Sequence, residues 1–221
     1  MIPADVELVL FDIDGTIMNA AGAGSAAFRD AAESCFGGQS PELDLAGTTD
    51  LAILAHIATH FGVEMTPELL ETFFARYHSA LEKNLSSSHY PSHVLPAVEE
   101  SIALFRSRGA HLGVLTGNSR PGASIKLRFS AVEHHFGFGA YGDEHAERND
   151  LGPLALARAE AHAQRRFAPE SVLIIGDTPR DIACARAIGA RCVAVATGHF
   201  TKQQLQEHAP DYLIDTLDCL I

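Results

Sequence analysis

Short apolar runs separated by amphipathic segments recur along most of this chain. The runs lie at Glu7–Phe11, His111–Leu115, Val172–Ile175 and Cys192–Ala196, with a weaker one at Tyr212–Ile214. Each run is bounded by turn residues, which is typical of a parallel strand buried on both faces. Helical patterns lie between them, at Ala97–Arg108, Pro121–Ser130, Pro153–Arg166, Pro179–Ile188 and Thr201–His208. The alternation predicts an α/β fold with a doubly wound parallel sheet, because parallel strands need crossover connections.

One interval departs from this alternation. From about Ala20 to Tyr90 the pattern is helical throughout, and it ends in the Ser- and Pro-rich stretch "SSSHYPSHVLP", which we interpret as a hinge. We therefore expect a core made of residues 1–17 and 91–221 and a small, inserted, all-helical cap at residues 18–90. Because ligands of open α/β sheets bind at the carboxyl ends of the strands, the cap would act as a lid over that site.

The composition argues against a membrane-spanning protein and against a nucleic-acid-binding protein. Of the 221 residues, 47% are hydrophobic and 20% are charged, which matches a soluble fold, and no apolar run approaches the ~20 residues of a membrane span. The opening "MIPADVELVLFD" does not resemble a signal peptide, so we expect a cytoplasmic protein without a membrane partner. The net charge of −12 opposes binding to nucleic acid. An anionic ligand must therefore meet a local positive site.

Carboxylates follow two of the predicted strands. The first strand ends in "FDIDGT" and the strand at 172–175 ends in "IIGDTPRD", so Asp12, Asp14, Asp177 and Asp181 are expected to gather around one point. Clustered carboxylates repel one another and lose hydration, so the arrangement needs a cation. Mg²⁺ prefers oxygen ligands and often shares them with a substrate phosphate, which predicts a Mg²⁺ site here.

The strand at 111–115 ends in "VLTGNS", which offers groups for a phosphate. Thr116 has a hydroxyl, and Gly117 and Asn118 can present N–H groups at the start of a helix, a common anion site. These residues could instead simply cap the helix. A carboxylate beside bound phosphate could attack phosphorus, and a second could transfer the protons.

The motifs "DIDGT", "LTGN" and "GDTPRD", in this order and spacing, resemble the haloacid dehalogenase superfamily, and in particular its capped phosphatases of the phosphoglycolate-phosphatase-like group. The resemblance covers nearly the whole chain and implies a Rossmann-like core. It implies Asp12 as the nucleophile and Asp14 as the general acid/base, whose backbone carbonyl also binds Mg²⁺. It further implies Thr116 as a phosphate ligand, Asp177 as a direct metal ligand, and Asp181 as a second carboxylate near the metal.

One expected motif is missing. Phosphatases of this family place a lysine upstream of the last strand motif, whereas this chain has "EHAERNDLGP", with Arg148 as the cation in that region. Lys126, in "GASIKLRF", is the rival candidate, because a long side chain can lean back toward the start of its helix. Either residue could also be an ordinary solvated surface cation.

Several other polar residues allow a structural interpretation. His56 and His60 lie four apart on one predicted helix face but lack the remaining features of a zinc site. "GTTD" at 47–50 is expected to start a cap helix, with Thr48 or Thr49 as the cap. Thr48 stands where similar sequences often carry a basic residue. The sequence does not indicate which way the side chains of the cap cations Arg29, Arg76 and Lys83 point. His199 follows a loop that is expected to border the site.

The sequence therefore predicts a Mg²⁺-dependent phosphatase that acts on a small phosphorylated metabolite through an aspartyl-phosphate. We expect a monomer or a weak homodimer. A phosphomutase of the same superfamily is the nearer alternative, because it shares the nucleophile. A non-catalytic binding or regulatory module on the same fold is the more distant one, suggested by the missing lysine.

Overall fold

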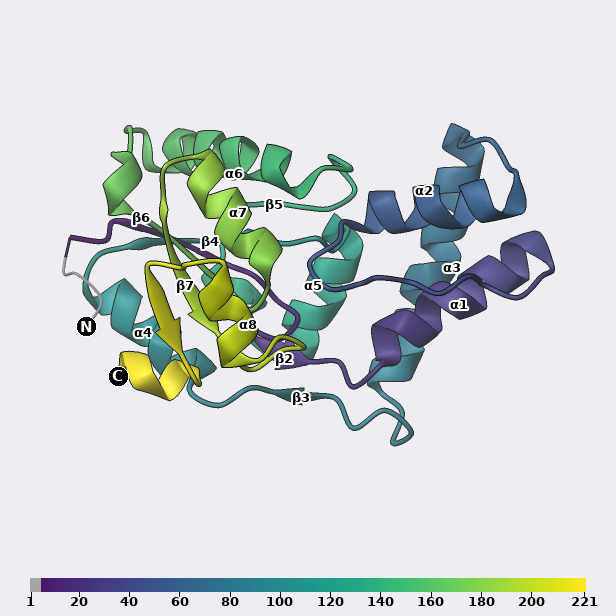
Figure 1. The fold of residues 1–221 in the computed structure, drawn as a ribbon, viewed down its shortest axis with the longest axis horizontal. Coiled ribbons are helices and arrows are strands. Elements are labelled where there is room, and N and C mark those ends of the chain that lie inside the picture. Colours follow the sequence, from purple (N-terminus) through teal and green to yellow (C-terminus); the bar gives the residue numbers. More distant parts are fainter. Residues whose placement is uncertain (1–4) are drawn as a thin grey trace.

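A six-stranded parallel sheet forms the centre of the protein, whose computed structural model describes residues 5–221 (Figure 1). The strand order is β5-β4-β1-β6-β7-β8, and every neighbouring pair is parallel. The strands are β1 (Leu8–Phe11), β4 (His111–Leu115), β5 (Gly139–Ala140), β6 (Val172–Gly176), β7 (Arg191–Val195) and β8 (Tyr212–Ile214). The predicted α/β fold class is confirmed.

Helices cover both faces of the sheet because successive side chains of each strand point to opposite faces. Phe11 packs in the same buried cluster as Phe105 of α4, whereas its neighbour Leu10 packs in a second cluster with Leu151 of α6. The helices of the core are α4 (Val98–Ser107), α5 (Arg120–Phe129), α6 (Arg148–Ala163), α7 (Pro179–Ala187) and α8 (Lys202–Glu207), with short 3₁₀ turns at Glu133–His135, Pro169–Ser171 and Leu217–Leu220. Among residues 5–221, no helix has both the length and the apolar character that crossing a membrane requires.

Three further helices lie together beyond one end of the sheet, on the right of Figure 1: α1 (Ala23–Phe36), α2 (Asp50–Phe61) and α3 (Pro67–Leu85). Aromatic rings join α1 to α3, and Phe28 stacks on Tyr77 with ring centroids 4.0 Å apart. A short antiparallel ribbon of β2 (Met18–Asn19) and β3 (His93–Val94) ties together the segments that leave and re-enter the core. This ribbon lies beside the boundaries that we propose for the cap, residues 18–90.

The main difference from the expected elements concerns α6. This helix begins at Arg148, five residues before the expected start at Pro153. Pro153 is the sixth residue of α6, beyond the first turn, so the helix continues through the proline with one backbone hydrogen bond missing. The earlier start has a functional consequence, because it places Arg148 at the helix N-terminus. The two-residue strands β2, β3 and β5 were also not predicted, since two residues show no periodicity.

The core packing around Phe105 gives a test of the fold. Phe105 is fully buried and meets Phe11 edge to face, with ring centroids 6.3 Å apart. We expect Phe105→Ala to lower the free energy of unfolding by about 3–5 kcal/mol, because it leaves a cavity beside the central strand. Urea denaturation measures this change. Ala103→Ser, at an exposed position of the same helix, should stay within about 0.5 kcal/mol of wild type; equal effects of the two substitutions would contradict the packing described.

Candidate active site

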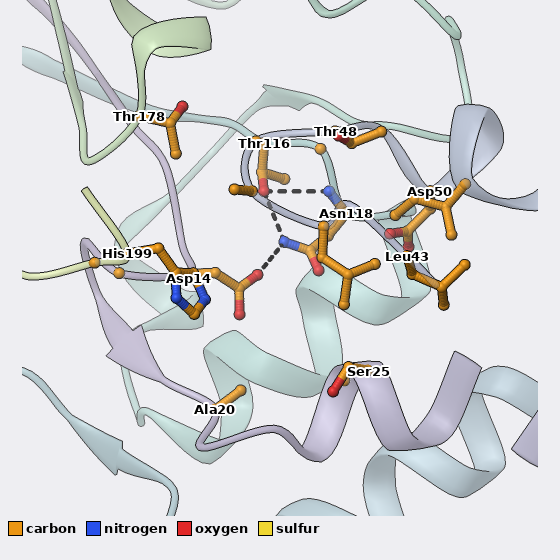
Figure 2. A pocket seen from close by; sticks show the side chains of 18 of the residues that line it. Asp14, Ala20, Ser25, Leu43, Thr48, Asp50, Thr116, Asn118, Thr178 and His199 are labelled. Atoms are coloured by element: carbon orange, nitrogen blue, oxygen red, sulfur yellow. Dashed lines mark hydrogen bonds between the residues drawn. The ribbon is translucent and has the colours of Figure 1, made fainter. Parts of the chain in front are cut away.

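Three neighbouring strands bring the predicted site residues to one edge of the sheet. Asp12 directly follows β1, Thr116 follows β4 and Asp177 follows β6, and these strands are adjacent and parallel. The N–H of Asp12 donates to the carbonyl of Ile175 at 2.9 Å, which fixes the end of β1 against β6. A pocket of about 700 Å³ opens between these strand ends and the segments of the proposed cap (Figure 2).

Three buried carboxylates form a cluster at this edge. Asp12, Asp177 and Asp181 each place an oxygen so that all three atoms lie within 4.8 Å of one another, and the residues are 4%, 3% and 0% exposed. Burial, reinforced by the neighbouring carboxylates, raises the pKa of Asp12 to about 7, although Arg148 opposes this shift. Burial likewise raises the pKa of Asp177 well above its usual range. Without added positive charge, the ionised cluster is therefore costly.

Arg148 supplies one positive charge to the cluster. Its Nη2 lies 3.2 Å from Asp12 Oδ1 and also pairs with Asp181 Oδ1. The first turn of a helix carries partial positive charge, which disfavours a cation there. The two carboxylates offset that effect, and they hold the guanidinium directly beside the expected nucleophile.

Asp181 has a second, structural task at the start of α7. Its Oδ2 accepts hydrogen bonds from the N–H and the hydroxyl of Thr178, at 3.0 and 2.7 Å, while the Thr178 hydroxyl accepts from the Asp181 N–H. This reciprocal pattern is a capping box. Both oxygens of Asp181 are thus engaged by protein groups, which fixes the position of this carboxylate within the cluster.

The cluster fits a divalent cation. Oδ1 of Asp177 is buried and has no hydrogen-bond partner among residues 5–221, and Arg148 pairs with only the other two carboxylates of the cluster. The surroundings of Asp177 are also shaped for a carboxylate, since a Cβ added at Gly15 or Gly198 would lie 2.3 or 1.6 Å from its Oδ2. Carboxylate oxygens are the ligands that Mg²⁺ prefers. Asp12 and Asp177 could hold the ion, with Asp181 beside them.

The Asp14 side chain is not one of the three carboxylates whose oxygens lie within 4.8 Å of one another among residues 5–221. That Asp14 joins them around one ion stays a prediction. Asp14 Oδ2 accepts from Lys126 Nζ at 2.6 Å and from Asn118 Nδ2 at 2.8 Å. Asn118 Nδ2 also donates to the Thr116 hydroxyl, and Figure 2 shows the hydrogen bonds that join Asp14, Asn118 and Thr116. The Asp14 side chain is 42% exposed and lines the pocket. Lys126 and Asn118 thus fix the position of Asp14 Oδ2.

Both candidate cations belong to the site, and the interpretation of either as a solvated surface residue was wrong. Lys126 and Arg148 are 4% and 5% exposed. Lys126 leans back along α5, as expected, and its Nζ also donates to Asn118 Oδ1 at 2.6 Å. The two cations contact different aspartates, so they are complementary and not alternatives for one position.

The loop after β4 also borders the pocket. Thr116, Gly117 and Asn118 all line it, at the start of α5. The Asn118 N–H is 3.3 Å from the Thr116 hydroxyl, and the Gly117 carbonyl accepts from the N–H of Asp50 at 2.7 Å. The structure thus brings together the residues predicted for phosphate binding, and their contact with phosphate stays a prediction.

A buried polar group that the sequence did not reveal joins α2 and α3 to the core. Asp50 Oδ2 accepts from the N–H of Ser119 at 2.7 Å, and the Ser119 hydroxyl lies 2.8 Å from His78 Nε2. Burial raises the pKa of Asp50 to about 6 and lowers the pKa of His78 to about 4. In the sequence, "GTTD" indicated first of all a helix start, and Thr49 does cap α2 by accepting from the Ala52 N–H. A carboxylate in the first turn of a helix is common, so the motif did not indicate that Asp50 binds Ser119.

The remaining candidates divide between the pocket and the surface. Those that line the pocket are Thr48, Arg29 and His199. Those that do not are Arg76, which donates to Ser34, and the exposed Lys83, His56 and His60. The two histidines are thus part of the outer face of α2, and Asp12, Asp177 and Asp181 are the one group with metal-site geometry in the part of the chain that the structure describes.

Comparisons with known proteins agree with this geometry. The family model "Haloacid dehalogenase-like hydrolase" matches residues 9–195. Phosphoglycolate phosphatase of Synechococcus elongatus is 29% identical over 143 residues, which cover 64% of this chain and 64%, or just under two thirds, of that protein.

Solved structures share the fold over nearly the whole chain. A structure from Bacteroides fragilis, described as a haloacid dehalogenase-like hydrolase, has a TM-score of 0.72 at 24% identity and covers 98% of this chain and 100% of that one. β-Phosphoglucomutase from Clostridium difficile has a TM-score of 0.72 at 17% identity, covering 98% and 93%. Because the family model spans most of the sequence and the sheet carries the three buried aspartates at its edge, this protein belongs to the haloacid dehalogenase-like hydrolase family.

Proposed function

We propose that this protein is a Mg²⁺-dependent phosphatase that hydrolyses a small phosphate monoester through an aspartyl-phosphate on Asp12. One observation carries the proposal: two aspartates that are two residues apart have different surroundings. Both line the pocket, but Asp12 is buried beside Arg148 and two other carboxylates, whereas the Asp14 side chain is 42% exposed and contacts Lys126. Separate surroundings suit separate roles, one as nucleophile and one as acid and base.

The two aspartates would divide the reaction into two steps. A carboxylate oxygen of Asp12 forms a bond to phosphorus while the bond to the leaving oxygen breaks, and Asp14 donates a proton to that oxygen. Asp14 then removes a proton from water, which attacks phosphorus, releases inorganic phosphate and restores the Asp12 carboxylate. Both hydrogen bonds that Asp14 accepts fall on Oδ2, so Oδ1 is the oxygen available for the proton.

The metal and phosphate groups are assigned from the cluster and the loop after β4. Asp12, Asp177 and the backbone carbonyl of Asp14 would hold Mg²⁺, with Asp181 nearby, and the bound ion would offset negative charge between nucleophile and phosphate. The phosphate oxygens would be bound by the Thr116 hydroxyl, the N–H groups of Gly117 and Asn118 at the start of α5, and the cations Arg148 and Lys126.

The pocket favours a small phosphorylated metabolite. Its volume of about 700 Å³ is bounded by both the core and the proposed cap, which together restrict the size of the leaving group. The relative from Synechococcus elongatus is a phosphoglycolate phosphatase, so a substrate of that kind is the first to try. The net charge of −12 opposes a nucleic-acid substrate. The cytoplasmic location and the monomeric or weakly dimeric state stay predictions.

A phosphomutase is the second candidate, because the fold is shared with β-phosphoglucomutase. A mutase uses the same nucleophile but protects the phosphoenzyme from water. Release of inorganic phosphate without a requirement for a sugar bisphosphate would contradict this alternative.

A non-catalytic module is less well supported. The missing lysine was its only motivation, and Arg148 now occupies the position beside Asp12 with a full positive charge. Three buried carboxylates would be costly for a scaffold with no use for them.

Phosphate release from a panel of small phosphate esters tests the proposal, with Asp12→Asn as the critical variant. We expect Mg²⁺-dependent turnover in the wild type and none in Asp12→Asn, since an amide is a poor nucleophile. Burial raises the pKa of Asp12 in the folded, metal-free protein to about 7, whereas an aspartate of the unfolded chain has a pKa of about 4. Metal-free wild type should therefore lose stability as the pH rises through this window, and Asp12→Asn should lack this part of the loss. A folded Asp12→Asn protein with wild-type turnover would refute the nucleophile.

Asp177→Ala should mainly weaken the response to Mg²⁺, because the substitution removes a proposed ligand whose Oδ1 has no protein partner among residues 5–221. We expect low activity that recovers partly at high Mg²⁺, measured as turnover over a Mg²⁺ titration. Asp215→Ala removes an exposed carboxylate paired with Lys202 and is the matched control, with unchanged metal dependence. An unaltered Mg²⁺ titration in Asp177→Ala would remove this residue from the metal site.

Removal of either cation should reduce turnover, but by different amounts. Arg148 touches the nucleophile, so Arg148→Ala should lower kcat about a hundredfold or more. Lys126→Ala should cost less, because Lys126 contacts Asp14 instead. Arg148→Lys should recover at least about tenfold of the loss, since it keeps a charge beside Asp12. Arg165→Ala, at a surface pair with Glu7, is the control and should stay near wild type. Full activity in both alanine variants would contradict the proposed phosphate site.

A further inference from the structure

A short loop before and into α2 is bound tightly to the catalytic loops. We call residues 46–51 the docking loop. Its backbone N–H groups of Asp50 and Leu51 donate to the carbonyls of Gly117 and Gly142, at 2.7 and 2.9 Å. The hydroxyl of Thr49 donates to the Ala146 carbonyl at 2.7 Å. The docking loop is therefore held against the segments that follow β4 and β5.

The contact is so close that side chains are excluded from it. A Cβ added at Gly117 would lie 2.3 Å from the carbonyl oxygen of Thr48, and one at Gly47 would lie 2.6 Å from Thr178 Oγ1. Gly47 also has a φ of +70°, which other residues rarely adopt. Backbone thus meets backbone between the proposed cap and the loops that carry the site. The structure shows the pocket with the docking loop in place.

Arg148 links this loop to the expected nucleophile. Its Nη2 is 3.2 Å from Asp12 Oδ1, and its Nη1 donates to the Gly47 carbonyl at 3.1 Å. These two donors belong to one rigid, planar guanidinium, so the position that satisfies Asp12 also satisfies Gly47. A lysine ammonium carries the same charge but presents its donors from a single atom, and it cannot reproduce the fork.

We propose that Arg148 is a positioning residue that couples the docking of loop 46–51 to the orientation of the Asp12 carboxylate. The guanidinium reaches its full set of acceptors only when the docking loop is in place. A docked loop therefore steadies Asp12, and an oriented Asp12 stabilises the docked loop, because coupling between two sites is reciprocal. The benefit for catalysis rests on the proposed function: the nucleophile would be fully oriented only when the pocket is closed to bulk water.

Arg180 of α7 provides a matched comparison. It also holds the docking loop, since it donates to the Ala46 carbonyl and pairs with Asp44 at 2.9 Å. Its side chain is 43% exposed and its contacts do not include Asp12. Arg180 can therefore loosen or tighten the loop without touching the nucleophile, whereas Arg148 contacts both.

Hydrogen exchange of the Asp50 and Leu51 amides measures docking directly, because these N–H groups donate across the contact. We would compare wild type, Asp12→Asn, Arg148→Lys and the double variant in Mg²⁺-containing buffer. Asp12→Asn should speed exchange of both amides about threefold or more, although Asp12 does not contact the docking loop. In a protein that already carries Arg148→Lys, Asp12→Asn should cause no further increase. The same cycle with Arg180→Lys should be additive. Loss of Mg²⁺ caused by Asp12→Asn enters both the Arg148 cycle and the Arg180 cycle. It therefore does not explain a difference between the two cycles.

Additive effects in the Arg148 cycle would overturn the proposal. Should Arg148→Lys fail to fold, the comparison of Asp12→Asn with wild type still decides, since unchanged exchange at Asp50 and Leu51 also overturns it. Exchange does not depend on turnover. A coupled loop in a protein without phosphatase activity would refute the proposed function alone, and an active phosphatase with an uncoupled loop would refute only the role of Arg148.

Discussion

The burial of three carboxylates against one another is the constraint on which the rest of this site depends. Asp12, Asp177 and Asp181 have lost almost all contact with solvent and lie within a few ångströms of one another. Their repulsion is strong in a medium that screens charge poorly, and each has lost its hydration. One guanidinium offsets only part of this charge. The site is therefore electrostatically incomplete, and a divalent cation and a phosphate held by the remaining donors would complete it.

The glycines of the site follow from the same constraint. A closed pocket strengthens electrostatic interactions by excluding water, so the backbone around the carboxylates must approach closely. At Gly142 an added Cβ would lie 1.7 Å from the carbonyl oxygen of Gly117, and at Gly198 it would lie 1.6 Å from Asp177 Oδ2. These residues contribute no side-chain chemistry. Their role is to let the loops after β4, β5 and β7 close around charged groups without steric conflict.

The sequence could predict the parts that depend on local pattern. Apolar runs marked β1, β4, β6 and β7, and because the carboxyl ends of parallel strands meet at one edge, the position of Asp12 beside Asp177 followed from topology. Contacts that depend on the path of a long side chain or on distant packing were not visible. Pro153 obscured the start of α6, and hence the depth of Arg148, while Asp50 resembled an ordinary first-turn acid. Such contacts arise only when segments that are distant in the sequence pack against one another.

The pairing of Lys126 and Arg148 with separate aspartates explains how this chain can differ from the family pattern. A lysine beside Asp12 would act as a point charge. Two cations beside the same carboxylate would be redundant. Here Lys126 binds Asp14 together with Asn118, so the acid/base candidate has its own cation. Arg148 contacts Asp12, and its second donor nitrogen binds the Gly47 carbonyl. The arginine therefore fits this site because the docking loop supplies an acceptor that a lysine would leave unused.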